Sequence, residues 1–281
     1  MILGIDLGGT NIRIGQIVRG EIIGKISEPS PSEQSLESSL EYLKTSIHRM
    51  MTDEVEGIGI GVPSVVDISR GVVYNVANIP SWKEVHLKDI LSDEFGLPVY
   101  INNDSNCFVL GEKEYGYGKS FKDIVGVTLG TGVGTGIVIN NVLYGGRNTG
   151  AGEIGSLSYL DATLEDYCSS DFFIRYHNTT GKDAAVRARQ GDVSALKIWD
   201  DFGVHIGHLM QAILYAYDPE LMILGGGIAE AYSLFENKMW EIMNEFPYPE
   251  TINNIQIKVT QNADISILGA AALATNKIST Y

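Results

Sequence analysis

Apolar residues along this chain follow two periods, one typical of strands and one typical of helices. At two places an apolar run breaks into Gly and Thr and then resumes: residues 2–7 precede 12–18, and residues 124–129 precede 137–143. Short apolar runs separated by Gly are typical of strands joined by a turn. The sequence therefore predicts two strand–turn–strand hairpins of similar design, one at the start of each half.

Helices are predicted where apolar residues recur at intervals of three and four. The first such face consists of Leu36, Leu40, Leu43, Ile47 and Met50. Ser32 is its expected N-cap, at the end of a loop over 28–32. Further helices are expected through Gly111 and Glu112 and over 87–95, 193–217, 233–245 and 265–276. The last of these is rich in small residues, which suits close packing against another element.

Strands are predicted between these helices, over 55–62, 98–101, 221–224 and 255–260. Helices and strands that alternate after each hairpin predict an α/β fold with mixed sheets. The length of 281 residues suits two lobes of ordinary size. We expect an N-terminal lobe over 1–117, completed by a C-terminal helix at 265–281, and a C-terminal lobe over 118–264.

Composition narrows the possible partners and compartments. The chain is 44% hydrophobic and 20% charged, as expected for a folded globule, and its net charge is −15. That charge repels polyanions, so nucleic acids and anionic membranes are not expected partners. The two cysteines, Cys107 and Cys168, are too few for a disulfide scaffold or a Cys-rich zinc site. Without a long apolar run or a leader-like N-terminus, we expect a soluble, cytoplasmic protein.

The two glycine turns are candidates for binding a polyphosphate. Glycine lets the backbone approach a ligand closely and adopt positive φ, and successive free N–H groups in such a turn can bind an anion. Four of the seven residues over 130–136 are glycine, more than a hairpin needs, and no Gly-Lys-Ser/Thr motif is present. Asp6 enters the first turn, where a carboxylate could reach phosphate-bound Mg²⁺ or could simply shape its own turn.

Asp104 is the candidate general base. It follows an apolar strand and lies between Asn103 and Asn106, whose amides could orient a hydroxylated ligand. Phosphoryl transfer to a hydroxyl needs one carboxylate to take the proton. Asp104 could instead cap the following helix, and the two roles are compatible.

Three other features have competing interpretations. Glu153, in a glycine-rich loop, could bind sugar hydroxyls or be a solvated loop residue. The run over 225–227 could admit adenosine or form a tight strand-to-helix turn. His205 and His208 lack carboxylates at zinc-ligand spacing and are interpreted as packing or surface residues.

Together these motifs resemble the ROK family of sugar kinases and sugar-responsive repressors, over essentially the whole chain. Residues 6–11 look like the family's first phosphate loop, 130–136 like its second, and 224–228 like its adenosine-side loop. The segment 59–63 resembles the motif before the sugar site, with Ser64 where Gly is more usual. The segments 78–82 and 103–106, with Gly111 and Glu112, resemble the sugar-contacting and catalytic motifs.

One region departs from the family pattern. Typical members have a zinc-ligating His after Gly-Glu-x-Gly, then a Cys-rich loop, then a Glu that contacts the sugar. Here Ser156 takes the His position, and the residues between it and Glu165 contain no Cys. The zinc module looks deleted, so we expect no structural zinc.

The resemblance implies a duplicated actin-like ATPase (ribonuclease H-like) fold with a cleft between two lobes. It also implies an ATP- and Mg²⁺-dependent kinase acting on a hydroxyl, expected to be O6, of a hexose or N-acylated hexosamine, and a homodimer. The alternative is a sugar-binding sensor of the same family that has lost catalysis. A repressor is not expected, because the chain begins at the first strand and its charge is wrong for DNA.

The site residues implied by this resemblance fall into three sets. Asp104 is the base. Sugar binding is assigned to Asn78, Asn103, Asp104, Glu153, Ser156 and Glu165. Nucleotide binding is assigned to Asp6, Gly8, Gly9, Thr10, Asn11, Gly130, Thr131, Gly132, Gly134, Gly225, Gly226 and Gly227, with Asp6 also expected at Mg²⁺.

Overall fold

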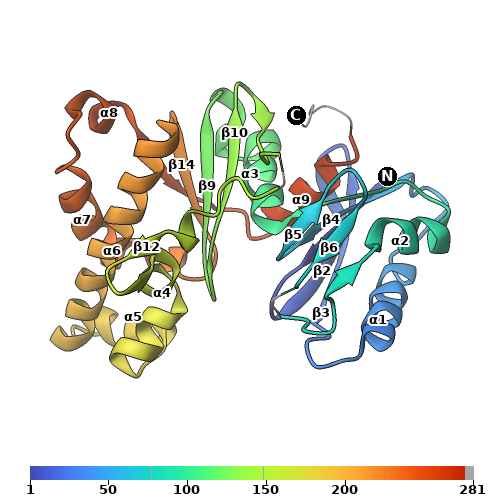
Figure 1. The fold of residues 1–281 in the computed structure, drawn as a ribbon, viewed down its shortest axis with the longest axis horizontal. Coiled ribbons are helices and arrows are strands. Elements are labelled where there is room, and N and C mark those ends of the chain that lie inside the picture. The colour runs from blue at the N-terminus through green and yellow to red at the C-terminus, as the bar shows by residue number, and fades with distance from the viewer. Residues whose placement is uncertain (77, 148, 276–281) are drawn as a thin grey trace. The chain divides into compact units, whose positions relative to one another are not determined.

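The computed structural model describes residues 1–76, 78–147 and 149–275, and the chain forms two compact units (Figure 1). Unit 1 consists of Met1–Lys122, Gly136–Ala151 and Asn262–Tyr281, and unit 2 consists of Asp123–Thr135 and Gly152–Gln261. The predicted lobe boundaries stay a prediction. The last part of the predicted C-terminal helix, residues 276–281, lies outside the described residues.

The first sheet has the strand order β3-β2-β1-β4-β8. Strand β2 pairs antiparallel with β1 and with β3, whereas β4 pairs parallel with β1 and with β8. The strands are β1 (Ile2–Leu7), β2 (Asn11–Val18), β3 (Glu21–Pro29), β4 (Gly57–Val62) and β8 (Val99–Asn103). The predicted hairpin over 2–18 is therefore confirmed.

Strand β3 corrects the expected loop over 28–32, because the strand continues through Pro29. Its residues alternate between exposed and half-buried, and the charged residues Glu21 and Lys25 take exposed positions. An edge strand of this kind has little apolar signal, and Pro is tolerated there because its missing N–H faces no partner strand.

The second sheet repeats the order of the first, as β11-β10-β9-β14-β15. Strand β14 pairs parallel with β9 and with β15, and β10 pairs antiparallel with β11. The strands are β9 (Ile124–Leu129), β10 (Val133–Ile139), β11 (Val142–Leu143), β14 (Leu221–Gly225) and β15 (Gln256–Val259). The same strand order, with β14 parallel to β9 and β15 as β4 is to β1 and β8, confirms that the fold is a duplication.

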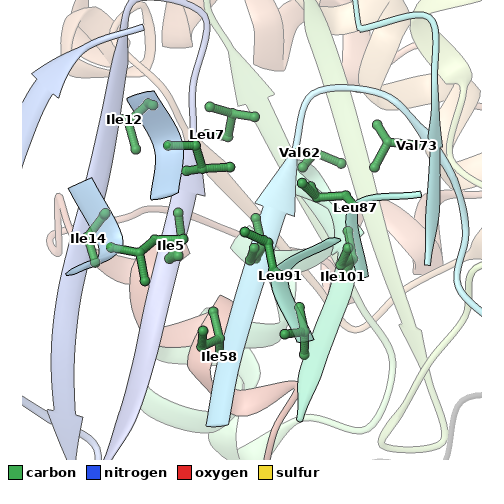
Figure 2. Packing of buried hydrophobic residues seen from close by; sticks show 14 of the residues in the cluster. Ile5, Leu7, Ile12, Ile14, Ile58, Val62, Val73, Leu87, Leu91 and Ile101 are labelled. Carbon is green, nitrogen blue, oxygen red and sulfur yellow. The ribbon is translucent and has the colours of Figure 1, made fainter. Parts of the chain in front are cut away.

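Helices cover both faces of the first sheet. One face carries α1 (Leu36–His48) and α2 (Leu87–Phe95), whose apolar side chains share a core with Leu3, Ile5 and Leu7 of β1. Figure 2 shows Ile5 and Leu7 in this core with Leu87 and Leu91 of α2. The Asp6 side chain and the α-hydrogen side of Gly4 lie on the other face because successive residues alternate along a strand.

That other face carries α9 (Ile265–Ala272), which packs closely against the strands and against α3 (Asp104–Tyr115). A Cβ added to Gly59 would lie 1.8 Å from the carbonyl oxygen of Ala270, and one added to Gly269 would lie 1.7 Å from that of Cys107. Backbones this close require glycine, so the expectation that the small residues of this helix serve close packing is confirmed.

The start of α1 differs from the prediction. Its N-cap is Ser35, whose side chain accepts a hydrogen bond from the Ser38 amide at 3.2 Å, so the assignment of Ser32 was wrong. Both serines precede the helix in sequence. The backbone turn over 30–34 decides which of them reaches the free amides, because only a residue with its side chain at the first helical turn can cap it.

The remaining elements complete the two units. Helix α6 (Val193–Tyr217) has the predicted bounds. The remaining α-helices are α4 (Leu164–Cys168), α5 (Gly181–Arg189), α7 (Tyr232–Met243) and α8 (Pro249–Asn254). The short strands are β5 (Val65–Asp67), β6 (Val72–Tyr74), β7 (Glu84–Val85), β12 (Ser158–Tyr159) and β13 (Ala162–Thr163). Across the described ranges, no helix combines the length and apolar character needed to span a membrane.

Candidate functional site

The first glycine turn joins β1 to β2 in unit 1. The Gly8 amide donates to the Asn11 carbonyl at 3.0 Å, and the Ser30 hydroxyl donates to the Gly8 carbonyl at 2.6 Å. Neither Gly8 nor Gly9 has positive φ, so the conformational freedom of glycine is not what this turn uses. A Cβ on Gly9 would lie 3.5 Å from the Asn78 side-chain nitrogen, which brings two predicted site residues together.

Asp6 is nearly buried, at 7% exposure, and it is paired with Arg13. The Arg13 Nε donates to Asp6 Oδ2 at 2.9 Å, and Nη2 contacts the same oxygen. The Arg13 Nη1 also donates to the Ala263 carbonyl at 2.6 Å. Asp6 is therefore held by Arg13 on the neighbouring strand. This is not the alternative role considered above, in which Asp6 shapes its own turn.

Asp104 is the first residue of α3, and Asn103 is the N-cap. The Asn103 Oδ1 accepts from the Ser105 amide at 2.9 Å and from the Asn106 amide at 3.3 Å. The capping role considered for Asp104 thus belongs to its neighbour. The Asp104 Oδ1 still accepts from the Ser105 amide, at 2.8 Å, so the start of the helix orients both side chains.

Burial, and then the charge of Asp6, raise the pKa of Asp104 to about 7. The register explains why two carboxylates are neighbours: Asp6 lies beside Gly61 on β4, and the next residue of β4, Val62, lies beside Asn103 on β8. The carboxyl ends of these parallel strands meet at one edge of the sheet, where α/β proteins bind ligands. A carboxylate with this pKa is suited to general base catalysis near neutral pH.

Two side-chain nitrogens near this edge are buried and unpartnered. Within the described ranges, Asn78 Nδ2 and Asn102 Nδ2 have no hydrogen-bond partner. A buried donor without a partner is costly, so such groups indicate a ligand or water in the functional state. Neither Asn102 nor Arg13 was predicted as a site residue, although the hairpin register that places Arg13 opposite Asp6 could have been inferred from the short turn.

The second glycine turn, in unit 2, joins β9 to β10. The Gly130 amide donates to the Gly132 carbonyl at 3.0 Å, and the Ser170 amide donates to the Gly130 carbonyl at 2.8 Å. The Val133 amide donates to Glu165 Oε2 at 2.8 Å. Glu165, predicted to contact the sugar, therefore lies against the predicted phosphate turn.

The third glycine run lies next to this turn, because Gly225 on β14 pairs with Thr128 on β9. Gly226 has a φ of 83°, and a Cβ there would lie 2.3 Å from the Leu129 carbonyl. A tight turn therefore needs glycine at this position. At Gly227, by contrast, a Cβ would meet nothing within 4 Å, so space remains beside the run for a ligand.

Glu153 precedes a short helical turn over Ile154–Ser156 and Ser156 is its last residue; both residues are exposed. Partial desolvation of its carboxyl group, and then the charge of Glu165, raise the pKa of Glu153, so Glu165 is near enough to act on this carboxyl group. The predicted site residues thus form two groups. Unit 1 holds 6–11, 78, 103 and 104, and unit 2 holds 130–134, 153, 156, 165 and 225–227.

The histidines pack as expected. Tyr159 and His205 are joined by a hydrogen bond of 3.1 Å between the hydroxyl and Nδ1, and burial, together with His208, lowers the pKa of His205 to about 4. Among the residues that the structure describes, no group of three or more His, Cys, Asp or Glu side chains could hold a metal ion. The absence of structural zinc stays a prediction.

The duplicated sheets, with carboxylates at the strand ends of the first and glycine turns in the second, define an actin-like ATPase (ribonuclease H-like) fold. The protein belongs to the ROK family, whose sequence profile matches residues 2–277. A solved structure from Cytophaga hutchinsonii is 31% identical to the chain, with a TM-score of 0.87 and coverage of 98% of this chain and all of the other.

Named relatives include kinases and repressors. The Thermotoga maritima glucokinase is 28% identical and covers 99% of this chain and 98% of its own length. A Streptomyces griseus ROK family glucokinase, solved with glucose and AMPPNP, is 27% identical with a TM-score of 0.84, covering 97% of this chain and 98% of that one. A Caldicellulosiruptor bescii xylose repressor is 27% identical and covers all of this chain and 79% of its own length.

Proposed function

We propose that this protein is an ATP-dependent sugar kinase. It would transfer the γ-phosphoryl group of MgATP to a hydroxyl, with O6 as the expected position, of a hexose or an N-acylated hexosamine. The observation that carries the proposal is Asp104, a carboxylate at the start of a helix whose pKa is raised to about 7. The similarity to glucokinases, one of them solved with a sugar and a nucleotide analogue, supports it.

In this proposal Asp104 is the catalytic base. Its carboxylate accepts the proton of the sugar hydroxyl while that oxygen bonds to phosphorus and the bond to ADP breaks. A base whose pKa lies near the working pH is ionised in a large share of the molecules, about half when the two are equal, and is still a good proton acceptor. The Ser105 amide donates to Oδ1 and holds the carboxylate in place, which serves catalysis because a reacting group must be kept in the productive geometry.

The glycine turns fit a nucleotide. At Gly130 and Gly227 a Cβ would meet nothing within 4 Å, so a ligand can approach the backbone at both positions. Asp6 would hold Mg²⁺, which when bound neutralises phosphate charge. Arg13 engages only Oδ2 of Asp6 among the described contacts, which is compatible with Oδ1 facing a metal ion or its water.

Besides Asp104, the side chains proposed to bind the sugar are those of Asn78, Asn103, Glu153, Ser156 and Glu165. Asn78 Nδ2 is a buried donor with no partner in the described part of the chain, as expected of a group that binds a ligand hydroxyl. Asn103, Glu153 and Ser156 would complete the polar surroundings of the ring. We also propose that the lobes meet at 117/118 and 264/265 in the sequence and that the protein is a homodimer. Light scattering on the purified protein would test the dimer.

The test is ATP consumption with a panel containing glucose, mannose, N-acetylglucosamine and N-acetylmannosamine. We expect turnover with at least one sugar and a loss of about 10²–10⁴-fold in Asp104→Asn, the usual effect of removing a general base. Turnover that persists in the variant would remove Asp104 from the base role.

Because the chain is also similar to a xylose repressor, a sugar-binding sensor without catalysis is the second candidate function. Sugar binding by calorimetry without turnover on any sugar would favour the sensor alternative over the kinase. Elemental analysis of the same sample would test the zinc prediction, since stoichiometric zinc contradicts it.

A further inference from the structure

The segment between Ser156 and Glu165 is a very short hairpin. Its strands, β12 and β13, have two residues each, and Leu160 at the turn has a φ of 51°. One further bond, from the Leu164 amide to the Leu157 carbonyl at 3.0 Å, closes its base. A hairpin this short is marginally stable unless it packs against another element. A contact outside the hairpin must therefore hold it in place.

We propose that Tyr159 and His205 are positioning residues for the sugar, because their hydrogen bond fastens this hairpin to α6. The hairpin joins Ser156 to Glu165, so its position sets where both side chains lie. The inference rests on the proposed function only in assigning Ser156 and Glu165 to sugar binding. It goes beyond that function because neither Tyr159 nor His205 is a sugar ligand in it.

Tyr159 links the hairpin to α6 by two kinds of contact. The Tyr159 side chain is half-buried, whereas Ser158, Leu160 and Asp161 beside it are exposed. Its hydroxyl is hydrogen-bonded to His205 Nδ1 at 3.1 Å, and the two rings meet edge-on with their centroids 5.7 Å apart. The first strand of the hairpin is therefore held to the helix through this one side chain.

The helix that carries Glu165 reaches the same histidine. Tyr167 of α4 is buried, and its ring centroid lies 4.8 Å from that of His205 and 5.4 Å from that of Tyr159. The Tyr167 hydroxyl also donates to Asp161 at the turn of the hairpin. His205 thus contacts both the hairpin before Glu165 and the helix turn after it.

Helix α6 is a firm anchor for these contacts. Phe202, three residues before His205, is fully buried, and its ring lies 5.5 Å from that of Trp199 and 5.4 Å from that of Phe172. Phe172 also packs against His205, at 5.3 Å. The aromatic core of unit 2 therefore sets the position of His205, and the hydrogen bond passes that position to the hairpin.

Both partners keep one protonation state near neutral pH. Burial, and then the charge of His208, lower the pKa of His205 to about 4, and burial raises the pKa of Tyr159 to about 12. The imidazole is therefore neutral and the phenol keeps its proton. A neutral imidazole has one N–H and one acceptor nitrogen, so Nδ1 can pair with a hydroxyl in either tautomer. Titration does not break this link between the two pKa values.

Hydrogen exchange of the ligand-free protein tests the anchor. In Tyr159→Phe, which keeps the ring, we expect exchange in a peptide spanning 157–165 to be about 3–10-fold faster, the effect of losing one hydrogen bond. His205→Phe should have the same effect, because it removes the other partner and keeps a ring against Tyr167. The double variant should exchange no faster than either single one. Unchanged exchange, or effects that multiply in the double variant, would overturn the inference.

A matched control makes the same chemical change elsewhere in unit 2. The hydroxyl of Tyr232 on α7 accepts a hydrogen bond from Trp240 Nε1 at 3.3 Å, and Tyr232 is half-buried like Tyr159. Tyr232→Phe should leave exchange over 157–165 and the sugar affinity unchanged. Equal effects of Tyr159→Phe and Tyr232→Phe would show a general loosening of the unit and would overturn the inference.

Calorimetry separates positioning of the sugar from a loss of overall order. The probes are ADP alone and each of the four sugars of the panel alone. We expect Tyr159→Phe to weaken sugar binding about 3–10-fold and to leave ADP binding within about 2-fold, since the lost hydrogen bond serves only the sugar-binding segment. Unchanged sugar binding, or equal weakening of both ligands, would overturn the inference. Wild-type protein that binds none of the four sugars would contradict the proposed function, while hydrogen exchange would still decide whether Tyr159 and His205 hold the hairpin.

Discussion

Arg13 on β2 lies directly opposite Asp6 on β1, and two of its nitrogens contact the same carboxylate oxygen. The guanidinium also donates to the Ala263 carbonyl, in the segment through which the chain re-enters unit 1 before α9. Because the charge of Asp6 is one cause of the raised pKa of Asp104, the ion pair influences the proposed base without touching it.

Replacing Arg13 with Met should therefore change the pH dependence of the reaction. With its cation removed, Asp6 would act more strongly on Asp104 and raise the pKa of that carboxyl further above 7. The acid limb of kcat/KM should move to higher pH, and the free energy of unfolding in urea should fall by about 1–3 kcal/mol, because a nearly buried carboxylate loses its partner. Arg13→Lys keeps a charge but not the paired geometry, so it should change the acid limb and the free energy of unfolding less. An acid limb that does not move in Arg13→Met would disprove the effect of the ion pair on Asp104.

In the wild-type protein the activity itself should titrate with Asp104. The base must be ionised, and its pKa of about 7 means that kcat/KM should rise as pH increases from 6 to 8 and then level off. Initial rates across that range at saturating Mg²⁺ would measure this. An acid limb near pH 4, the ordinary range of Asp, would show that burial and Asp6 do not perturb the group.

Stability should show the opposite trend at the same residue. The pKa of Asp104 is higher in the folded than in the unfolded state, so the native protein binds more protons between pH 3.8 and about 7, and stability falls as pH rises through this window. Asp104→Asn removes that loss. We expect the Tm of the variant relative to wild type to be higher at pH 8 than at pH 4.5, measured by differential scanning fluorimetry; an equal difference at both would argue against the raised pKa.

Gly59→Ala should strongly destabilise unit 1. The added methyl would lie 1.8 Å from the Ala270 carbonyl, so α9 must move away from β4, and overpacking of this kind costs about 1–3 kcal/mol or more. Urea unfolding would measure it. Gly150→Ala is a suitable comparison because a Cβ there meets nothing within 4 Å, and it should change stability by less than about 0.5 kcal/mol.

The N-cap of α1 can be tested with two neighbouring serines. Ser35→Ala should cost about 1 kcal/mol, because the Ser38 amide loses its side-chain acceptor. Ser32→Ala, at the position that sequence reasoning favoured, should be close to neutral. Equal effects in thermal unfolding would mean that the helix begins differently from the structure described above.

Elements defined by local periodicity were predictable. Helix α6 has the expected bounds because its apolar face is long, Asp192 caps its start and Asp218-Pro219 ends it. The first hairpin was equally clear, whereas the strand expected over 137–143 is two strands, Val133–Ile139 and Val142–Leu143. Strand β3 was missed because half of its positions face outward, and the cap at Ser35 because two serines satisfy the same sequence rule.

The sequence by itself determined the duplicated α/β pattern, the glycine turns and the presence of an Asp at a strand end, since each depends on residues that are close along the chain. Only the tertiary structure decided that Arg13 holds Asp6, that Asn103 and not Asp104 caps α3, and that Glu165 binds the Val133 amide. The first and the third depend on strand register and packing, which bring distant residues together, whereas the cap depends on the residue at which the helix begins. The chemistry of the proposed base follows from them, because its pKa reflects which groups surround it in the folded chain.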